Sequence, residues 1–419
     1  FAKWYGFSIL PKHIYEGTDW TKNPYNEKPV GTGPFKFVEW VKNDHLTLEA
    51  YDKYFRGRPY LDKIVYRMIP SMPTAILALS KGEVNYITNP PYVEVKPLKE
   101  AGKINIFIGL GDVIQGLYFN LRIKPFDDVR VRRAIGHAIA SRDVNEKAAF
   151  GMNTICTGAY LPYSWADDPT ALNPEYDPGK AEKLLDEAGY KRGPDGTRFQ
   201  AKLISWMGMN TEDMAAVMKE HLRKVGIGIT IEVLDWGTFV KKVIERHDFE
   251  LALMGGKQGP EPDTCFRVYI MKGAYRNIGG YNNSRVDELI NKGVTVVDRK
   301  ERAKYYHEIC RELVKDLPRI ALLTLNNAYP CSVGFRNTPL ENYAVSKGML
   351  LRFDKTWWEQ ATGVLPAATT TATTTTGTTA LAPADTTTWY AAGALGVVII
   401  AAALLVKLAR KRSSSKTPS

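Results

Sequence analysis

The chain contains few of the residues that usually hold metal ions or build disulfide frameworks. Its 419 residues include four cysteines and six histidines. The cysteines form no CxxC pair, and the histidines form neither HExxH nor HxH, so we expect no metal site and no cofactor. Gly-x-Ser-x-Gly, Walker and GxGxxG patterns are also missing. The sequence therefore predicts a protein that is not an enzyme.

Acidic residues are almost absent from the C-terminal region, where only Asp385 follows Glu359. Five bases crowd the last thirteen residues: Lys407, Arg410, Lys411, Arg412 and Lys416. The whole chain has a formal net charge of +11, of which residues 1–361 contribute +7, interleaved with acids. The excess charge therefore belongs in large part to the C-terminus, and a nucleic-acid partner is not indicated.

The C-terminal region divides into three segments that together predict a membrane anchor. Residues 362–388 are nearly half threonine and resemble an extended, O-glycosylated stalk. Residues 389–406 are apolar, small or aromatic and begin with a Trp-Tyr pair, and as a helix they would span about 27 Å. The basic tail, 407–419, predicts a cytoplasmic C-terminus by the positive-inside rule. The alternative, a buried core helix, does not fit a segment that follows a stalk. We therefore expect a single-pass protein of the cell membrane with its remaining residues outside the cell.

The N-terminus begins at Phe1 without an initiator methionine or a signal peptide. A domain outside the cell needs an export signal. We therefore expect the sequence to start inside a longer, N-terminally truncated protein.

Residues 1–361 alternate β-rich runs with amphipathic helical segments, which predicts an α/β fold. Strands are expected at 46–50, 63–69, 227–234 and 249–254. Helices are expected at 71–82, 177–189 and 214–225, with Asp177 as an N-cap and a capping-box-like start at Ser284 and Asp287.

Several motifs follow one another in an order that resembles a known family. They are Val30-Gly-Thr-Gly-Pro-Phe, the Tyr54–Ile64 stretch, Tyr118-Phe-Asn, Pro125-Phe-Asp-Asp-Val-Arg, Tyr176-Asp-Pro-Gly-Lys-Ala, Asp235-Trp and Glu312-Leu-Val-Lys-Asp-Leu-Pro. This order is similar to that of the extracytoplasmic solute-binding proteins of ABC transporters, peptide-binding (family 5) class.

The resemblance implies a two-lobed, periplasmic-binding-protein-like fold of type II that closes on a ligand between its lobes. The implied divisions are 1–113 for the remainder of lobe I, 114–120 for a hinge, 121–322 for lobe II and 323–361 for the return to lobe I. Family members have a further segment before the Gly-Thr-Gly-Pro-Phe stretch, which agrees with a truncated start.

The implied ligand-binding residues are aromatic walls and a few polar groups. Trp236 stands where the family often places an aromatic of the pocket, although it could equally be a packing residue at a strand end. Trp206 is a second candidate. Tyr118 and Asn120 lie beside the implied hinge, where Asn120 could tie down the backbone as well as contact a ligand.

The segment of Gly255, Gly256, Lys257 and Gln258 departs from the family pattern. Peptide binders typically carry Gly-Trp-x-x-Asp here, with the Asp pairing the α-ammonium group of the ligand. Gly256 stands where Trp is expected, and no Asp follows, although Glu261 or Asp263 could substitute. A buried ammonium without a carboxylate would cost several kcal/mol. The departure therefore favours a sugar or another neutral solute, and archaeal sugar binders of this class share the stalk and anchor, which indicates an archaeal source.

We hypothesise a membrane-tethered substrate-binding subunit of an ABC importer. Its partners would be an oligosaccharide or oligopeptide ligand, the permease and ATPase subunits, and the membrane. The alternatives are a stalked receptor or adhesion ectodomain, which would bind no small solute, and a surface hydrolase, which would need converging carboxylates or a triad.

Overall fold

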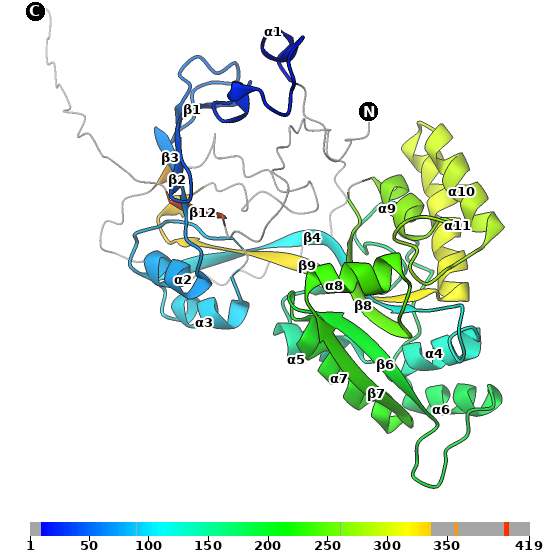
Figure 1. Cartoon of the computed structure of the whole chain (residues 1–419). Coiled ribbons are helices and arrows are strands. Elements are labelled where there is room, and N and C mark those ends of the chain that lie inside the picture. The colour runs from blue at the N-terminus through cyan, green and yellow to red at the C-terminus, as the bar shows by residue number, and fades with distance from the viewer. Residues whose placement is uncertain (1–9, 89, 260, 337–356, 359–397, 402–419) are drawn as a thin grey trace, which may run out of the picture. The chain divides into compact units, whose positions relative to one another are not determined.

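The computed structural model describes residues 10–88, 90–259, 261–336, 357–358 and 398–401 (Figure 1). The expected stalk (362–388) and tail (407–419) lie outside the described residues, as does most of the apolar segment 389–406. Its residues Val398–Ala401 are described, and they form a short strand, β12. Within the described ranges, no helix combines the length and the apolar character that a membrane crossing requires.

The described chain forms two compact units. Residues 108–328 belong to the first unit, which we call unit 1. Residues 10–107, together with the described residues from 329 onward, belong to the second, unit 2.

Unit 2 contains a four-stranded sheet in the order β1-β2-β3-β12, in which all neighbours are antiparallel. Its strands are β1 (Phe35–Val41), β2 (His45–Ala50), β3 (Lys63–Met68) and β12. A two-stranded ribbon joins β10 (Phe335–Arg336) to β11 (Trp357–Trp358). The helical segments are α1 (Lys12–Tyr15), η1 (Pro24–Asn26), α2 (Met72–Ser80) and α3 (Tyr92–Glu100). The expected strands at 46–50 and 63–69 are thereby confirmed.

The helix expected at 71–82 forms as α2, and its two ends follow from the residues there. The Ser71 hydroxyl accepts the N–H of Thr74 at the first turn. Gly82 has a φ of +75°, which a glycine adopts without strain, and this residue ends the helix.

Unit 1 is built on a six-stranded sheet in the order β5-β9-β4-β8-β6-β7. The strands are β4 (Ile104–Phe119), β5 (Thr154–Ile155), β6 (Phe199–Trp206), β7 (Ile227–Leu234), β8 (Leu251–Lys257) and β9 (Arg319–Ser332). The start of β4, up to residue 107, and the end of β9, from residue 329, belong to unit 2. Strand β6 runs parallel to both β7 and β8, whereas β4 runs antiparallel to β8. The expected strand at 227–234 is confirmed, and the one expected at 249–254 begins and ends slightly later, as β8.

Helices cover both faces of this sheet (Figure 1). They are α4 (Val129–Ala138), α5 (Ser141–Ala149), α6 (Pro178–Glu187), α7 (Thr211–Lys224), α8 (Trp236–Phe239), the π-helical turn η2 (Val240–Glu245), α9 (Pro262–Tyr269), α10 (Ser284–Thr295) and α11 (Arg299–Asp316). Leu117 of β4 packs in the core under α4–α7, whereas Ile114 and Tyr118 pack in cores on the other face, because side chains alternate along a strand. The α/β class expected from the sequence is confirmed.

The caps of two helices test the sequence patterns directly. The Asp177 carboxylate accepts the N–H of Lys180 at the start of α6, as expected. At α10, however, the N-cap is Asn283 and not Ser284, because the Asn283 amide oxygen accepts the N–H groups of Arg285 and Val286. The capping box expected at Ser284 is therefore wrong by one residue.

Asp167 is a carboxyl group inside the core under α9–α11, where only 8% of the residue is exposed. Burial disfavours the carboxylate and raises its pKa from 3.8 to about 6, against the opposing effect of a hydrogen bond from the Tyr160 backbone. The Cys310 thiol lies 3.9 Å from one carboxyl oxygen. The folded chain therefore holds this proton at pH values where the unfolded chain has lost it.

We expect Asp167→Asn to stabilise the protein at pH 7.5 but not at pH 3.5. Above pH 4 the unfolded carboxyl is ionised while the folded one stays protonated up to about pH 6, so the free energy of unfolding falls over this interval and stays reduced above it. The amide removes this penalty, and the gain is about 1–3 kcal/mol. Urea unfolding at both pH values measures it.

Asp168→Asn is the matched control. Its carboxylate accepts hydrogen bonds from Thr170 and pairs with Arg311 at 2.6 Å, so this change should destabilise the fold at pH 7.5. An equal effect of Asp167→Asn at both pH values would contradict the buried-proton explanation.

Candidate ligand-binding site

Strand direction brings most of the sequence candidates to one edge of the unit 1 sheet. Because β6, β7 and β8 are parallel, their carboxyl ends lie at the same edge, where α/β sheets usually bind ligands. Trp206 ends β6, Trp236 lies just after β7, Gly255 to Lys257 end β8, and Gln258 follows it. We call these residues, with Met207–Met209 and Asp235, the carboxyl edge.

Two tryptophans form an aromatic surface at this edge. The rings of Trp206 and Trp236 meet edge to face with centroids 5.0 Å apart, and Trp236 stacks on Phe239 at 5.7 Å. Trp236 remains 40% exposed, and the neighbouring Met207 and Met209 are exposed too. The edge therefore offers an apolar surface to a solute, while its polar groups lie at the end of β8.

Local backbone geometry places Trp236 at this position. The Asp235 side chain accepts the N–H of Thr238 and begins α8 one residue beyond the end of β7. Arg276 approaches the indole with its guanidinium 5.8 Å from the ring centroid. Trp236 thus packs on Phe239 and is also partly exposed, and its contact with a ligand stays a prediction.

Each glycine of the β8 end makes room for a neighbouring side chain. A Cβ atom on Gly255 would lie 2.5 Å from the Gln115 amide oxygen, and one on Gly256 would lie 2.8 Å from the Tyr269 ring. Gln115 is fully buried, and its amide makes no hydrogen bond within the described part of the chain. The Tyr269 ring thus occupies the space that a side chain at position 256 would need.

Gln258 and Lys257 lie just past these glycines. The Gln258 N–H donates to the Asp112 carbonyl at 2.6 Å, and its side-chain amide donates back to the Gly256 carbonyl. The Cys265 thiol donates to the Gln258 amide oxygen. Lys257 places its ammonium 4.0 Å from the Asp112 carboxylate. Gln258 is therefore a buried part of the edge, and Lys257 balances an acid there.

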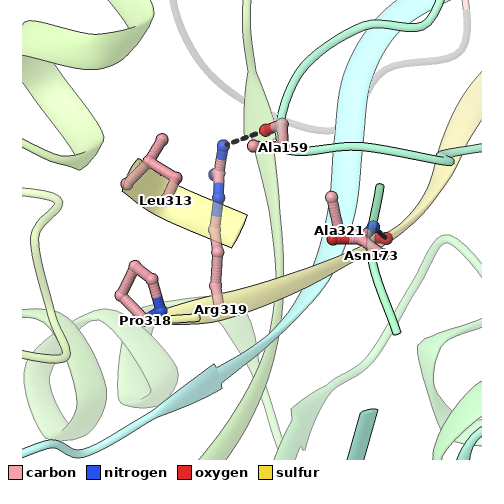
Figure 2. Close-up of a pocket in the computed structure, with 6 residues that line it drawn as sticks. All are labelled: Ala159, Asn173, Leu313, Pro318, Arg319 and Ala321. Carbon is pink, nitrogen blue, oxygen red and sulfur yellow. Dashed lines mark hydrogen bonds between the residues drawn. The ribbon is translucent and has the colours of Figure 1, made fainter. Parts of the chain in front are cut away.

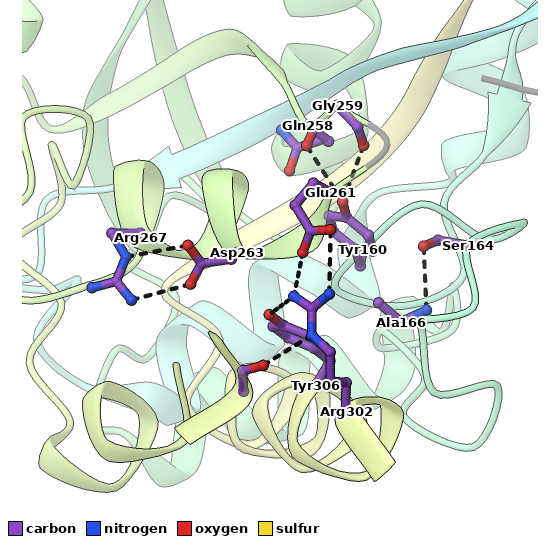
Figure 3. Close-up of polar contacts among 11 residues, drawn as sticks. Tyr160, Ser164, Ala166, Gln258, Gly259, Glu261, Asp263, Arg267, Arg302 and Tyr306 are labelled. Carbon is purple, nitrogen blue, oxygen red and sulfur yellow. Dashed lines mark hydrogen bonds and ion pairs between the residues drawn. The ribbon is translucent and has the colours of Figure 1, made fainter. Parts of the chain in front are cut away.

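Neither Glu261 nor Asp263 supplies an uncompensated carboxylate (Figure 3). Glu261 pairs with the Arg302 guanidinium through both carboxylate oxygens. Asp263 pairs with Arg267 at 3.1 and 3.3 Å. Both acids are thus already paired with an arginine in the α9–α11 region.

Two sequence candidates lie away from the carboxyl edge. Asn120 follows β4 and therefore lies beside the amino end of the antiparallel β8, about 20 Å from Lys257 along the strand. Its amide donates to the carbonyls of Phe249 at 2.9 Å and His247 at 3.3 Å. Asn120 thus holds backbone. Tyr118 is buried in mid-sheet, where its hydroxyl accepts a hydrogen bond from Arg319 at 2.7 Å.

Arg319, the first residue of β9, is a buried residue that sequence reasoning missed. It also lines a small cavity with Ala159, Asn173, Leu313, Pro318 and Ala321 (Figure 2). The cavity volume of about 10 Å³ matches one water molecule and excludes a sugar ring. One signal was available in the sequence: Arg319 is the single charged residue that opens an otherwise apolar run, Ile320 to Leu323.

Histidine, cysteine, aspartate and glutamate side chains form no group of three or more that would hold a metal ion, as far as the described ranges extend. Cys156 and Cys265 are buried thiols whose pKa burial raises to about 12. The site is therefore a set of aromatic and hydrogen-bonding groups.

Comparison with known proteins assigns the family. Residues 3–276 match the family model of bacterial extracellular solute-binding proteins, family 5. The chain belongs to this family. Its members are binding proteins and not enzymes, which confirms the expectation that the chain is not an enzyme.

Individual relatives agree with this assignment. The chain is 31% identical over 338 residues to the oligopeptide-binding protein AppA of Bacillus subtilis, covering 76% of this chain and 62% of AppA. It is 27% identical over 287 residues to heme-binding protein A of Haemophilus influenzae, covering 68% of this chain and 52% of that protein. The chain thus spans between half and two thirds of these relatives.

A solved structure shows the same fold. The ABC transporter substrate-binding protein CtaP of Listeria monocytogenes superimposes with a TM-score of 0.76 at 23% identity, covering 83% of this chain and 71% of that one. The periplasmic-binding-protein-like α/β fold is therefore shown for this chain.

We expect Gly256→Ala to destabilise the protein by about 1–3 kcal/mol, because the added methyl group overpacks against the Tyr269 ring. The double variant Gly256→Ala/Tyr269→Ala should lose less stability than the two single variants together. The difference between its loss and the sum of the two single losses should be at least about 1 kcal/mol. Urea unfolding of the four proteins measures this coupling.

Gly33→Ala serves as the control, because among the described residues no atom beyond its two chain neighbours lies within 4 Å of its Cβ position. Its cost should stay within about 0.5 kcal/mol. Strictly additive costs at positions 256 and 269 would show that Tyr269 is not what keeps the position a glycine.

Proposed function

We propose that the chain is the extracellular substrate-binding subunit of an ABC importer, which captures an oligosaccharide or oligopeptide and delivers it to a permease. The observation that carries this proposal is the convergence of Trp206, Trp236 and the Gly255–Gln258 segment at the carboxyl edge of a family 5 solute-binding fold. Binding and release of a solute at such an edge require no nucleophile and no acid–base pair.

The aromatic surface suits either solute class. An indole face packs against the apolar side of a sugar ring and equally against a peptide side chain. The Gln115 amide, which has no hydrogen-bond partner among the described residues, adds a donor and an acceptor, and an unsatisfied buried amide costs about 1–3 kcal/mol. AppA is an oligopeptide-binding protein and the Haemophilus relative a heme-binding protein, so family membership alone leaves the solute open.

We expect Trp236→Ala to weaken solute binding about 10- to 100-fold, because it removes the most exposed aromatic of the carboxyl edge. A thermal-shift screen with di- to pentasaccharides and peptides selects the probe, and calorimetry with that probe measures the loss. Tyr176→Ala, which removes an exposed aromatic elsewhere in unit 1, should leave the affinity unchanged. If no probe of either class shifts the melting temperature, the alternative of a receptor or adhesion ectodomain is favoured.

We further propose that residues 389–406 tether the protein to the cell membrane. The support is the run of apolar residues, the Trp-Tyr pair before it and the bases after it. Residues 398–401 pair with β3 in the described structure, so a membrane helix would require β12 to leave that sheet edge. Insertion and strand pairing are therefore alternative states of one segment.

Replacing both Ile399 and Ile400 with arginine should release the exported full chain from membranes, because each central arginine adds about 2.5–3.5 kcal/mol to the insertion free energy. Alkaline carbonate extraction followed by immunoblotting measures the membrane-bound fraction. Arginine at Thr375 and Thr376, within the expected stalk, is the matched control and should not release the protein. Wild-type protein that already extracts with carbonate would contradict the tether.

A further inference from the structure

The guanidinium of Arg319 is a buried charge surrounded by neutral groups. The residue is 6% exposed. Its hydrogen bonds go to the Tyr118 hydroxyl at 2.7 Å, the Ala159 carbonyl at 3.4 Å and the Gln258 amide oxygen at 3.5 Å. Figure 2 shows the side chain leaving β9 toward Ala159. Within the described part of the chain, no carboxylate pairs with it.

The acids around the end of β8 each have another cation. Asp112 lies opposite Lys257, Glu261 binds Arg302, and Asp263 binds Arg267. Asp168, on the loop below, pairs with Arg311. Asp167 is buried and forms no ion pair among the described residues, and burial raises its pKa. Each of these paired acids thus has a cation other than Arg319, and Arg319 has no ion-pair partner among the described residues.

This buried charge begins in mid-sheet beside Tyr118 and reaches the carboxyl edge through one side chain, Gln258. Arg319 contacts Gln258, and Gln258 in turn donates to the Gly256 carbonyl at the end of β8. Charges interact strongly through the low dielectric of a protein interior, so an ammonium group of a ligand at this edge is repelled and a carboxylate is attracted. A carboxylate would also offset the cost of burying an arginine without a counter-charge.

We propose that the ligand presents a carboxylate, and not an ammonium group, to the carboxyl edge, with Arg319 as the buried counter-charge that sets this preference. The inference rests on the proposed solute-binding function. The carboxylate would come from the C-terminus of a peptide or from an acidic sugar. Arg319 acts on the ligand through its charge and through Gln258, so it is a specificity-determining residue.

The test compares four probes by calorimetry on the full chain in detergent. They are an N-acetylated tripeptide with a free carboxylate, the same tripeptide as a C-terminal amide with a free ammonium, digalacturonate, and neutral maltotriose. We expect the carboxylate probe of one source, peptide or sugar, to bind at least about 10-fold more tightly than the ammonium probe. Tighter binding of the ammonium probe would overturn the inference, whereas no binding of any probe would overturn the proposed function itself.

Arg319→Gln separates charge from structure. If the charge sets the preference, this variant loses about 10-fold in affinity for the carboxylate probe while its affinity for maltotriose or the ammonium probe is unchanged or increased. An equal loss for every probe means that Arg319 only braces the fold, and it overturns the inference. Arg285→Gln, which removes an equal charge from the exposed side of α10, should leave the ratio unchanged.

Gln258→Glu keeps Arg319 in place and supplies the carboxylate internally, so it tests the same point if Arg319→Gln does not fold. It should reduce the preference for carboxylate over ammonium by a similar factor. A preference that survives this substitution unchanged would contradict a role for the Arg319 charge.

Discussion

The direction of the strands in unit 1 is the constraint on which the candidate site depends. Because β6, β7 and β8 are parallel, the residues that end them meet at one edge although up to about fifty positions separate them. The same constraint places Asn120 at the opposite edge of the sheet, because it follows the antiparallel β4. Local sequence near Asn120 resembles a family motif, and in the structure its side-chain amide donates to the carbonyls of His247 and Phe249.

Local patterns in the sequence were sufficient for the α/β class, for β7 at 227–234 and for the Asp177 cap of α6. These patterns did not predict side-chain contacts between residues that are far apart in the sequence. The Arg319–Tyr118 hydrogen bond joins residues 201 positions apart, and no periodicity or motif indicates it. The pairing of Glu261 with Arg302 is similar, since the two side chains meet only when α11 packs beside α9. The N-cap of α10 is Asn283, whereas the sequence predicted Ser284. Both residue types cap helices well, so the sequence could not distinguish them, and the backbone geometry selects Asn283.

The absence of a large side chain at position 256 is explained by volume. Tyr269 lies where a Cβ atom at Gly256 would go, and Gln115 does the same for Gly255. Burial raises the pKa of Tyr269 to about 12, as expected for a hydroxyl largely removed from water. The segment therefore keeps its two glycines because the aromatic and amide groups beside it fill the space. The glycine at position 256, where the family pattern has a tryptophan, and the Tyr269 ring that fills the space beside it therefore belong to the same packing arrangement.

Asp167 and Arg319 of unit 1 are buried and form no ion pair among the described residues, and they differ in how they can adjust. Asp167 lowers its cost by keeping a proton up to about pH 6. Arginine has no such option, because a guanidinium stays protonated at any physiological pH. Its charge must therefore be stabilised by neutral dipoles, here Tyr118, Ala159 and Gln258, or by a counter-charge from outside the unit. Dipoles alone replace only part of the lost hydration, and this remaining cost is the physical reason that a carboxylate on the solute would bind there more favourably than an ammonium group.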